Sequence, residues 1–315
     1  MAHQRDSSTG VAHVFRYVIY DTMTDRPYSG NSTPIFILDD SKPWPEDSIL
    51  QTVSSEMNQA EHSFVRRDSG NTYTARWFTP IAEERFCGHG TVGIALALAE
   101  HTRSTSFTIK TKIGITISIE VAPPSNKGGP FTPAHVTMQF PEDAVTPGSV
   151  TDSTKRAFAE ALGISVNDIV AIAENEIKDI IVELPPHRDF SARAMAIDPK
   201  AMLKASPPGT RSQVITSAGR GTRGADFFKR VFAFGGEDQA TGSTYASLAP
   251  YWGAKLGKSN LVAEQISLRG GGAEMHWDAE KKTVSVVAKG VKVGQGEFWV
   301  PLRPPNAGSG FQAKL

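Results

Sequence analysis

The chain has 315 residues and contains 33 basic and 33 acidic side chains, so it carries no formal net charge. This balance excludes most nucleic-acid-binding proteins and proteins of anionic membrane surfaces, because both usually carry a basic excess. Hydrophobic residues make up 39% of the chain, which is typical of a globular protein with one or two domains. Its single cysteine, Cys87, can form neither an internal disulfide nor a thiolate metal cage.

Membrane and targeting signals in the sequence bear on where the protein lies in the cell. The longest apolar run, residues 92–99, is far shorter than the roughly 18 residues of a membrane span, and residues 1–6 do not lead into a signal peptide. We therefore expect a soluble, cytoplasmic protein. The last three residues, Ala313-Lys314-Leu315, resemble a peroxisomal address on a Pro/Gly/Ser-rich tail that we expect to be loosely held.

The first half of the chain alternates strands with two helices. Residues 48–57 predict an amphipathic helix, whereas residues 88–100 have small and aliphatic side chains on every face and predict a helix buried inside the protein. Alternating apolar residues or turn signals predict strands. These strands lie at residues 14–20, 34–38, 61–65, 72–78, 106–121 and 135–140.

Turn residues become frequent around residues 141–150, so we place a domain boundary between residues 145 and 146. The second half begins with a surface helix at 154–162 and contains a second Ala-rich helix at 242–256. Residues 219–224 match G-x-G-x-x-G, but no long helix follows, so we predict a loop without a nucleotide. The strands predicted here lie at residues 178–184, 213–216, 228–234, 263–268, 273–277, 283–288 and 292–300.

An internal duplication becomes visible when the chain is shifted by 154 residues. The shift aligns Arg76-x-Phe78 with Arg230-x-Phe232, Glu83-Glu84 with Glu237-Asp238, and Cys87-Gly88 with Thr241-Gly242. We therefore predict an α+β fold of two pseudo-symmetric domains, residues 1–145 and 146–300. Each would be a mostly antiparallel β-roll or barrel around one central buried helix, and residues 301–315 could complete the first domain with a further strand.

Both predicted buried helices begin at a glycine, Gly88 and Gly242. The first turn of a helix offers free N–H groups and the positive end of the helix dipole, which together attract anions. Two such helix ends that face each other across a cleft would bind a small carboxylate-bearing molecule.

Five motifs, in order along the chain, also carry a family resemblance: Ser29-Gly30-Asn31, Asn58-Gln59-Ala60-Glu61-His62-Ser63-Phe64-Val65, Arg76-Trp77-Phe78-Thr79-Pro80, Cys87-Gly88-His89-Gly90-Thr91 and Glu237-Asp238-Gln239-Ala240-Thr241-Gly242-Ser243. They resemble the motifs of the phenazine-biosynthesis PhzF-like proteins. That family is similar in fold to diaminopimelate epimerase and proline racemase, so the resemblance implies two pseudo-symmetric domains with the active site between them. Gln239 stands where the family commonly has proline.

The resemblance implies proton transfer without a cofactor. The best-studied member of the family isomerises a dihydro-hydroxyanthranilate. By this resemblance Glu61 would shuttle the proton, His89, Asp238 and Ser243 would line the pocket, and the protein would form a homodimer. The eight histidines show no metal-binding spacing, so we predict no metal.

We therefore expect an isomerase or epimerase of biosynthesis or secondary metabolism that acts on a small carboxylate-bearing metabolite. Glu61, with His89 and Asp238, would be catalytic. The other candidate residues would bind substrate, chiefly through backbone amides at the two helix ends. They are Asn31, Gly88, Gly90, Gly242, Ser243 and Thr244.

Two alternatives stay open. One is a racemase or dehydratase of the same fold that uses Cys87. The duplicate of Cys87 is Thr241, whose hydroxyl is too weak an acid to complete a two-thiol pair, so we favour a structural Cys87 and read Glu84 as a surface or capping residue. The other alternative is a binding or scaffold protein that keeps the fold without turnover, because a fold does not fix a function.

Overall fold

The computed structural model describes residues 11–112, 114–122, 131–219 and 224–301. Strands and helices in these ranges confirm the predicted α+β class. Among the described residues, no helix is both long and apolar enough to cross a membrane. The tail after residue 301, with the predicted address at 313–315, lies outside the described residues, as does 220–223 of the predicted loop.

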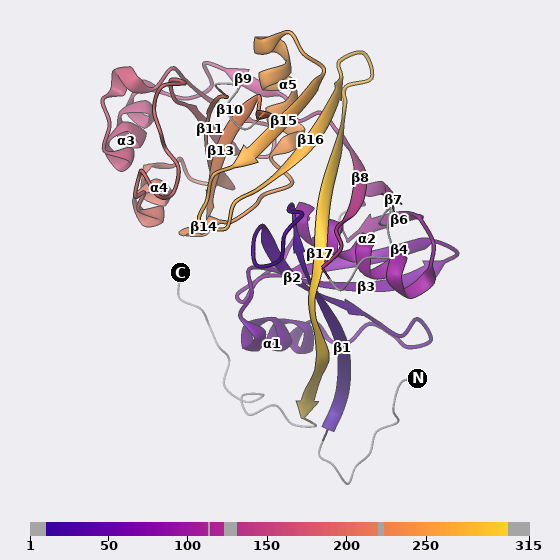
Figure 1. Cartoon of the computed structure of the whole chain (residues 1–315). Coiled ribbons are helices and arrows are strands. Elements are labelled where there is room, and N and C mark those ends of the chain that lie inside the picture. Colours follow the sequence, from indigo (N-terminus) through magenta and orange to yellow (C-terminus); the bar gives the residue numbers. More distant parts are fainter. Residues whose placement is uncertain (1–10, 113, 123–130, 220–223, 302–315) are drawn as a thin grey trace.

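Figure 1 shows two lobes that share one long strand, β17 (Thr283–Pro301). The first lobe is built from the elements that precede residue 142. They are β1 (Val11–Thr22), β2 (Asn31–Ile37), α1 (Asp47–Met57), β3 (His62–Ser69), β4 (Thr72–Phe78), β5 (Glu83–Glu84), α2 (Gly88–Thr102), β6 (Ser106–Thr111), β7 (Thr116–Ala122) and β8 (Ala134–Pro141).

The second lobe is built from the elements between β8 and β17. They are β9 (Val145–Pro147), α3 (Asp152–Leu162), the 3₁₀ turn η1 (Val166–Asp168), β10 (Ala171–Asn175), β11 (Asp179–Glu183), α4 (Pro199–Ala205), β12 (Ser212–Ala218), β13 (Phe227–Ala233), β14 (Gly236–Asp238), α5 (Tyr245–Leu256), β15 (Asn260–Gln265) and β16 (Gly271–Asp278).

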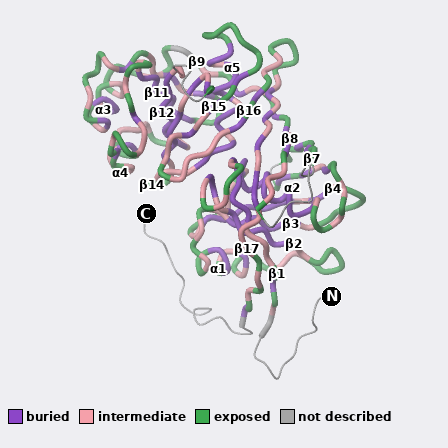
Figure 2. The backbone as a smooth tube through the Cα atoms, in the orientation of Figure 1, coloured by how far each residue is buried: buried purple, intermediate pink, exposed green. Residues whose placement is uncertain are grey.

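The strands of the first lobe form a closed ring of eight in the order β1, β2, β3, β4, β6, β7, β8 and β17. Helix α2 packs against six of these strands, and its residues 88–98 are all buried. Small side chains allow this close approach, since a Cβ on Gly93 would lie 2.7 Å from Thr33. In Figure 2 buried residues are purple in both lobes, those of α2 among them. The N-terminal end of α2 is therefore held inside the molecule.

The second lobe repeats this order of strands. Its parallel pairs β11–β12 and β13–β15 correspond to β2–β3 and β4–β6 of the first lobe, and α5 packs against β15, β16 and β17. The ion pair that precedes each helix is repeated too. Arg76 donates to both carboxylate oxygens of Glu83 at 2.7 Å, and Arg230 donates to those of Glu237 at 2.7 and 2.8 Å.

Several local predictions were wrong. Residues 106–121, predicted as one strand, form the antiparallel strands β6 and β7. Residues 283–301 form one strand rather than two, because residues 283–290 pair with β8 and residues 290–301 pair with β1 without a turn between them. Position 290 of that strand is a glycine because a Cβ there would approach the Leu96 side chain to 2.5 Å. Helix α5 begins at Tyr245 rather than Gly242, and α4 was not predicted. The domain boundary at residue 145 stays a prediction.

Candidate active site

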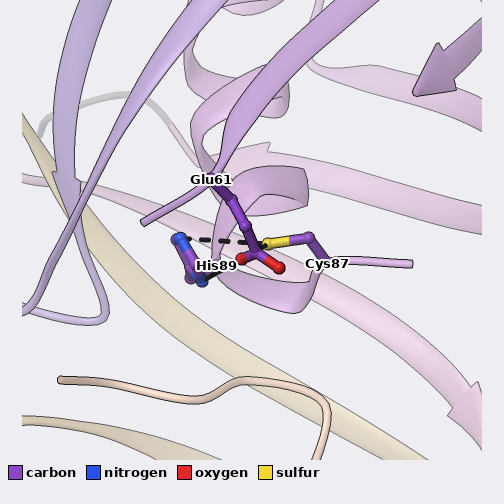
Figure 3. A group of neighbouring side chains, drawn as sticks. All are labelled: Glu61, Cys87 and His89. Carbon is purple, nitrogen blue, oxygen red and sulfur yellow. Dashed lines mark hydrogen bonds and ion pairs between the residues drawn. The ribbon is translucent and has the colours of Figure 1, made fainter. Parts of the chain in front are cut away.

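Three side chains of the first lobe meet at the N-terminal end of α2 (Figure 3). Cys87 donates from Sγ to Oε2 of Glu61 across 2.7 Å. His89 Nδ1 lies 3.3 Å from the same carboxylate oxygen and 3.3 Å from the sulfur. Glu61 comes from the residue directly before β3, so a strand start and a helix start together build this cluster.

The local backbone fixes the cluster. Cys87 is the N-cap of α2 with an extended backbone, and its Sγ accepts a hydrogen bond from the Gly90 amide at 3.1 Å. A side chain at position 90 would collide with Ser63 Oγ at 2.6 Å and with Trp77, so the helix start must lie close against β3 and β4. His89 is only 2% exposed and has little freedom to rotate away.

Burial sets the charge state of the cluster. It raises the pKa of Glu61 to about 8, to which the nearby charge of Asp238 contributes, while the hydrogen bond from Cys87 acts in the opposite direction. Burial also raises the pKa of the Cys87 thiol well above its usual value and lowers the pKa of His89. Near neutral pH the cluster therefore consists of a thiol, a neutral imidazole and a carboxyl group that is mostly protonated.

The second lobe joins the site through Asp238, the last residue of β14. Asn31 Nδ2 donates to Asp238 Oδ1 at 2.6 Å and lies 3.2 Å from His89 Nδ1. Because an amide nitrogen only donates, His89 Nδ1 accepts and the imidazole carries its proton on Nε2. Thr241 Oγ1 donates to the other Asp238 oxygen at 2.6 Å. Asn31 thus links the two lobes through its side-chain amide nitrogen, and its role in substrate binding stays a prediction.

The starts of the two buried helices are in backbone contact. A Cβ on Gly88 would lie 2.7 Å from the Ser243 amide nitrogen, and one on Gly242 would lie 3.2 Å from the Gly88 carbonyl carbon. Residues 242–244 form a turn that leads into α5. The backbone amides of this turn therefore lie at the position where the sequence predicted the start of the second buried helix. The predicted site residues of both halves therefore lie together.

Some polar residues of this region escaped the sequence analysis. Lys229 is fully buried and donates from Nζ to Thr241 O at 2.5 Å and to Thr244 Oγ1 at 2.6 Å. Arg211 donates from Nη1 to Ser243 Oγ at 3.2 Å. A lysine inside the apolar strand pattern at 228–234 was a usable signal, whereas nothing around Arg211 in the sequence marks it.

A metal ion has one set of candidate ligands among the described residues. One ligand atom each of Glu61, Cys87 and His89 lies within 4.8 Å of the others. A carboxylate, a thiol and an imidazole form a donor set that zinc accepts in catalytic sites. Within the structure these groups satisfy one another, and the absence of a metal stays a prediction.

The fold and the site together define an α+β protein whose ionisable cluster lies where two duplicated lobes meet. Residues 20–296 match the family model of phenazine biosynthesis-like proteins, PhzC-PhzF. The match covers most of the chain, and the chain therefore belongs to this family.

Relatives and solved structures agree with this membership. Two uncharacterised isomerases of Pseudomonas aeruginosa are 31% and 29% identical to the chain, cover 84% and 88% of it, and are themselves covered over 92% and 96% of their lengths. The crystal structure of a PhzC/PhzF protein from Clostridium difficile shares 26% identity at a TM-score of 0.72, over 90% of this chain and 98% of that one. The prediction of a PhzF-like isomerase is confirmed.

A more distant likeness concerns the fold alone. A hydroxyproline epimerase from Agrobacterium vitis, solved with trans-4-hydroxy-L-proline, has a TM-score of 0.58 at 10% identity, over 96% of this chain and 94% of that one.

Proposed function

We propose that the protein is a cofactor-independent isomerase or epimerase that moves a proton on a small carboxylate-bearing metabolite. Glu61 is the acid and base, and the site lies between two pseudo-symmetric domains. The contact of Glu61 with Cys87 and His89 at the start of α2 carries this proposal.

Glu61 has the properties that a proton shuttle needs. An ordinary carboxylate is too weak a base for carbon acids, but a pKa of about 8 makes Glu61 both a stronger base and a usable acid near neutral pH. A minority of the molecules would hold the ionised form at pH 7. The carboxylate takes a proton from carbon, and the same carboxyl group then protonates another carbon or the other face.

The helix starts supply the electrostatic part of the mechanism. The amides of 88–90 and 242–244 surround the contact between the two lobes, and they would hold the substrate carboxylate and the negative charge that develops on proton removal. His89 and Asp238 would orient a polar group of the substrate. Asn31 would fix the orientation of both.

The thiol fits a supporting role better than that of the base. Cys87 donates a hydrogen bond to Glu61, and burial and the neighbouring carboxylates raise the pKa of the thiol well above its usual value. A thiolate is therefore disfavoured, and Thr241 on the other lobe cannot replace a second thiol.

Deuterium exchange tests the proposal. The protein is incubated in D₂O with a dihydro-hydroxyanthranilate or with trans-4-hydroxy-L-proline, and loss of carbon-bound protons is followed by ¹H NMR. Wild type should exchange one proton of an accepted compound, and Glu61→Gln should slow the exchange at least about 100-fold. Glu100→Gln, at the far end of α2, serves as the control and should exchange like wild type. Equal exchange by Glu61→Gln would show that Glu61 is not the base.

A further inference from the structure

One cation stands beside the starts of both buried helices. The Arg211 side chain is 33% exposed, and Nη1 donates to Ser243 Oγ at 3.2 Å, in the turn that touches Gly88 of the first lobe. Burial raises the pKa of both Glu61 and Glu84, and the charge of Arg211 acts in the opposite direction on each, so the guanidinium acts on carboxyl groups that belong to the other lobe.

Asp179 holds the Arg211 guanidinium in one orientation, on the side opposite Nη1. Nε and Nη2 of Arg211 donate to the two oxygens of Asp179 at 2.8 and 2.6 Å. Asp179 is fully buried, and it also accepts from Ser212 Oγ at 2.7 Å and from Asn175 Nδ2 at 3.1 Å. Because both carboxylate oxygens are saturated, the arginine fork cannot rotate, and its Nη1 side stays turned to the helix starts.

This cation breaks the symmetry of the duplicated site. The start of α2 and the turn that leads into α5 both offer backbone amides to an anion, so these amides alone do not decide which way round a substrate lies. Strand β12 corresponds to β3, and Arg211 and Glu61 each directly precede their strand, so the first lobe has a carboxyl group where the second lobe has this guanidinium. The Glu61 carboxyl lies at the start of α2 in the first lobe, and it repels a substrate carboxylate whenever it is ionised.

We propose that Arg211 is the residue that orients the substrate, binding its carboxylate at the α5 side of the site so that the acidic C–H faces Glu61. This inference rests on the proposed function and names its substrate class. The class consists of molecules with a carboxylate at one end and the reactive carbon on the side turned toward the first lobe.

Anthranilate is a suitable probe because it combines a ring carboxylate with a neighbouring amine, and its fluorescence reports binding. Anthranilamide has the same shape without the negative charge. Wild type should bind anthranilate at least tenfold more tightly than anthranilamide, and Arg211→Gln should lose at least tenfold in affinity for anthranilate while its weak affinity for anthranilamide stays the same.

The controls separate a binding role from a structural one. Arg188→Gln removes an arginine of matched exposure, 32%, that is likewise paired with a carboxylate, Asp168 at 2.6 Å, and it should bind like wild type. Arg211→Lys keeps the charge without the fork and should bind with intermediate affinity. Because Arg211→Gln leaves a buried carboxylate unpaired, the double variant Arg211→Gln/Asp179→Asn replaces it if the single variant does not fold.

The outcomes are decisive for Arg211 alone. Unchanged anthranilate affinity in Arg211→Gln or in the double variant would overturn the inference, as would wild type that binds the amide as well as the acid or binds neither compound. The proton-shuttle role of Glu61 is read from deuterium exchange in Glu61→Gln, so it can survive or fail separately.

Discussion

The side-chain amide of Asn31 donates to Asp238 across 2.6 Å and joins β2 of one lobe to β14 of the other. The same nitrogen also lies 3.3 Å from the Ala240 carbonyl oxygen. A single amide thus orients an acid of the second lobe and, through its contact with His89, an imidazole of the first.

Replacing this amide should affect turnover more than folding. Asn31→Ala frees the Asp238 carboxylate and removes the donor to His89, so we expect deuterium exchange to fall about 10- to 100-fold with a loss of about 1–2 kcal/mol of stability. Asn31→Asp keeps the size of the side chain but places a second carboxylate beside Asp238. It should therefore reduce both deuterium exchange and stability more than Asn31→Ala does. Exchange assays and thermal melting check both variants, and an Asn31→Ala enzyme with normal exchange contradicts the orienting role.

Glu61 should make the protein less stable at alkaline pH. Its pKa rises from 4.5 in the unfolded chain to about 8 in the folded protein, so the favourable contribution of the protonated group is complete below about pH 4.5 and is lost as the pH rises through 8. Glu61→Gln stays neutral at every pH. We expect the variant to melt within about 2 °C of wild type at pH 5 and at least about 4 °C above it at pH 9. A melting difference that is independent of pH would contradict the raised pKa.

Cys87 should tune Glu61 rather than replace it. Cys87→Ser keeps a donor to the carboxylate and should retain activity within about tenfold, which corresponds to roughly 1.4 kcal/mol of barrier. Cys87→Ala removes the hydrogen bond that lowers the pKa of Glu61, so the alkaline rise in the pH–rate profile should move to higher pH. Loss of several orders of magnitude in Cys87→Ser would instead favour the cysteine-dependent mechanism.

The contact between the two helix starts leaves no room for a methyl group at Gly88. A Cβ there would lie 2.7 Å from the Ser243 nitrogen, whereas a Cβ on Gly242 would lie 3.2 Å from its nearest neighbour, the Gly88 carbonyl carbon. Gly88→Ala should therefore separate the lobes locally, cost about 1–3 kcal/mol of stability and weaken anthranilate binding. Gly242→Ala should do less. The reverse order, measured by melting and fluorescence titration, would refute this packing argument.

The duplicated ion pair should matter more than exposed pairs do. The side chains of Arg230 and Glu237 are 3% and 15% exposed, so Arg230→Gln leaves a buried carboxylate without its partner and should cost about 3–5 kcal/mol. Arg16→Gln breaks a pair whose side chains are 69% and 44% exposed and should cost less than about 1 kcal/mol. Denaturant unfolding of the two variants compares them directly.

The sequence predicted those parts of the fold that local patterns control. The run of small and aliphatic residues from Gly88 predicted the buried helix α2 with the correct start, and the 154-residue offset aligned Arg76 with Arg230 and Glu83 with Glu237, the residues that form the two ion pairs. The sequence also predicted that the residues around Gly88 and Gly242 would face each other, and they lie in contact, although α5 begins three residues after Gly242.

Long-range packing decided what the sequence could not predict. The single strand β17 exists because β8 and β1 accept consecutive parts of it, which no local signal at Gly290 reports. Arg211 reaches the site only because β11 and β12 pair in parallel and place Asp179 opposite Ser212. Tertiary pairing of this kind leaves no periodic trace in the chain.

The sharing of β17 has a consequence for the order in which the protein folds. Residues 283–301 supply one of the eight strands of the first ring, yet they follow the whole second lobe in the chain. During synthesis the edges of β1 and β8 that pair with β17 stay unpaired until the rest of the chain has been made. Unpaired strand edges are prone to pair with other chains. The oldest part of the nascent protein is therefore completed last, and premature termination anywhere before residue 283 would release a molecule with an open barrel around α2.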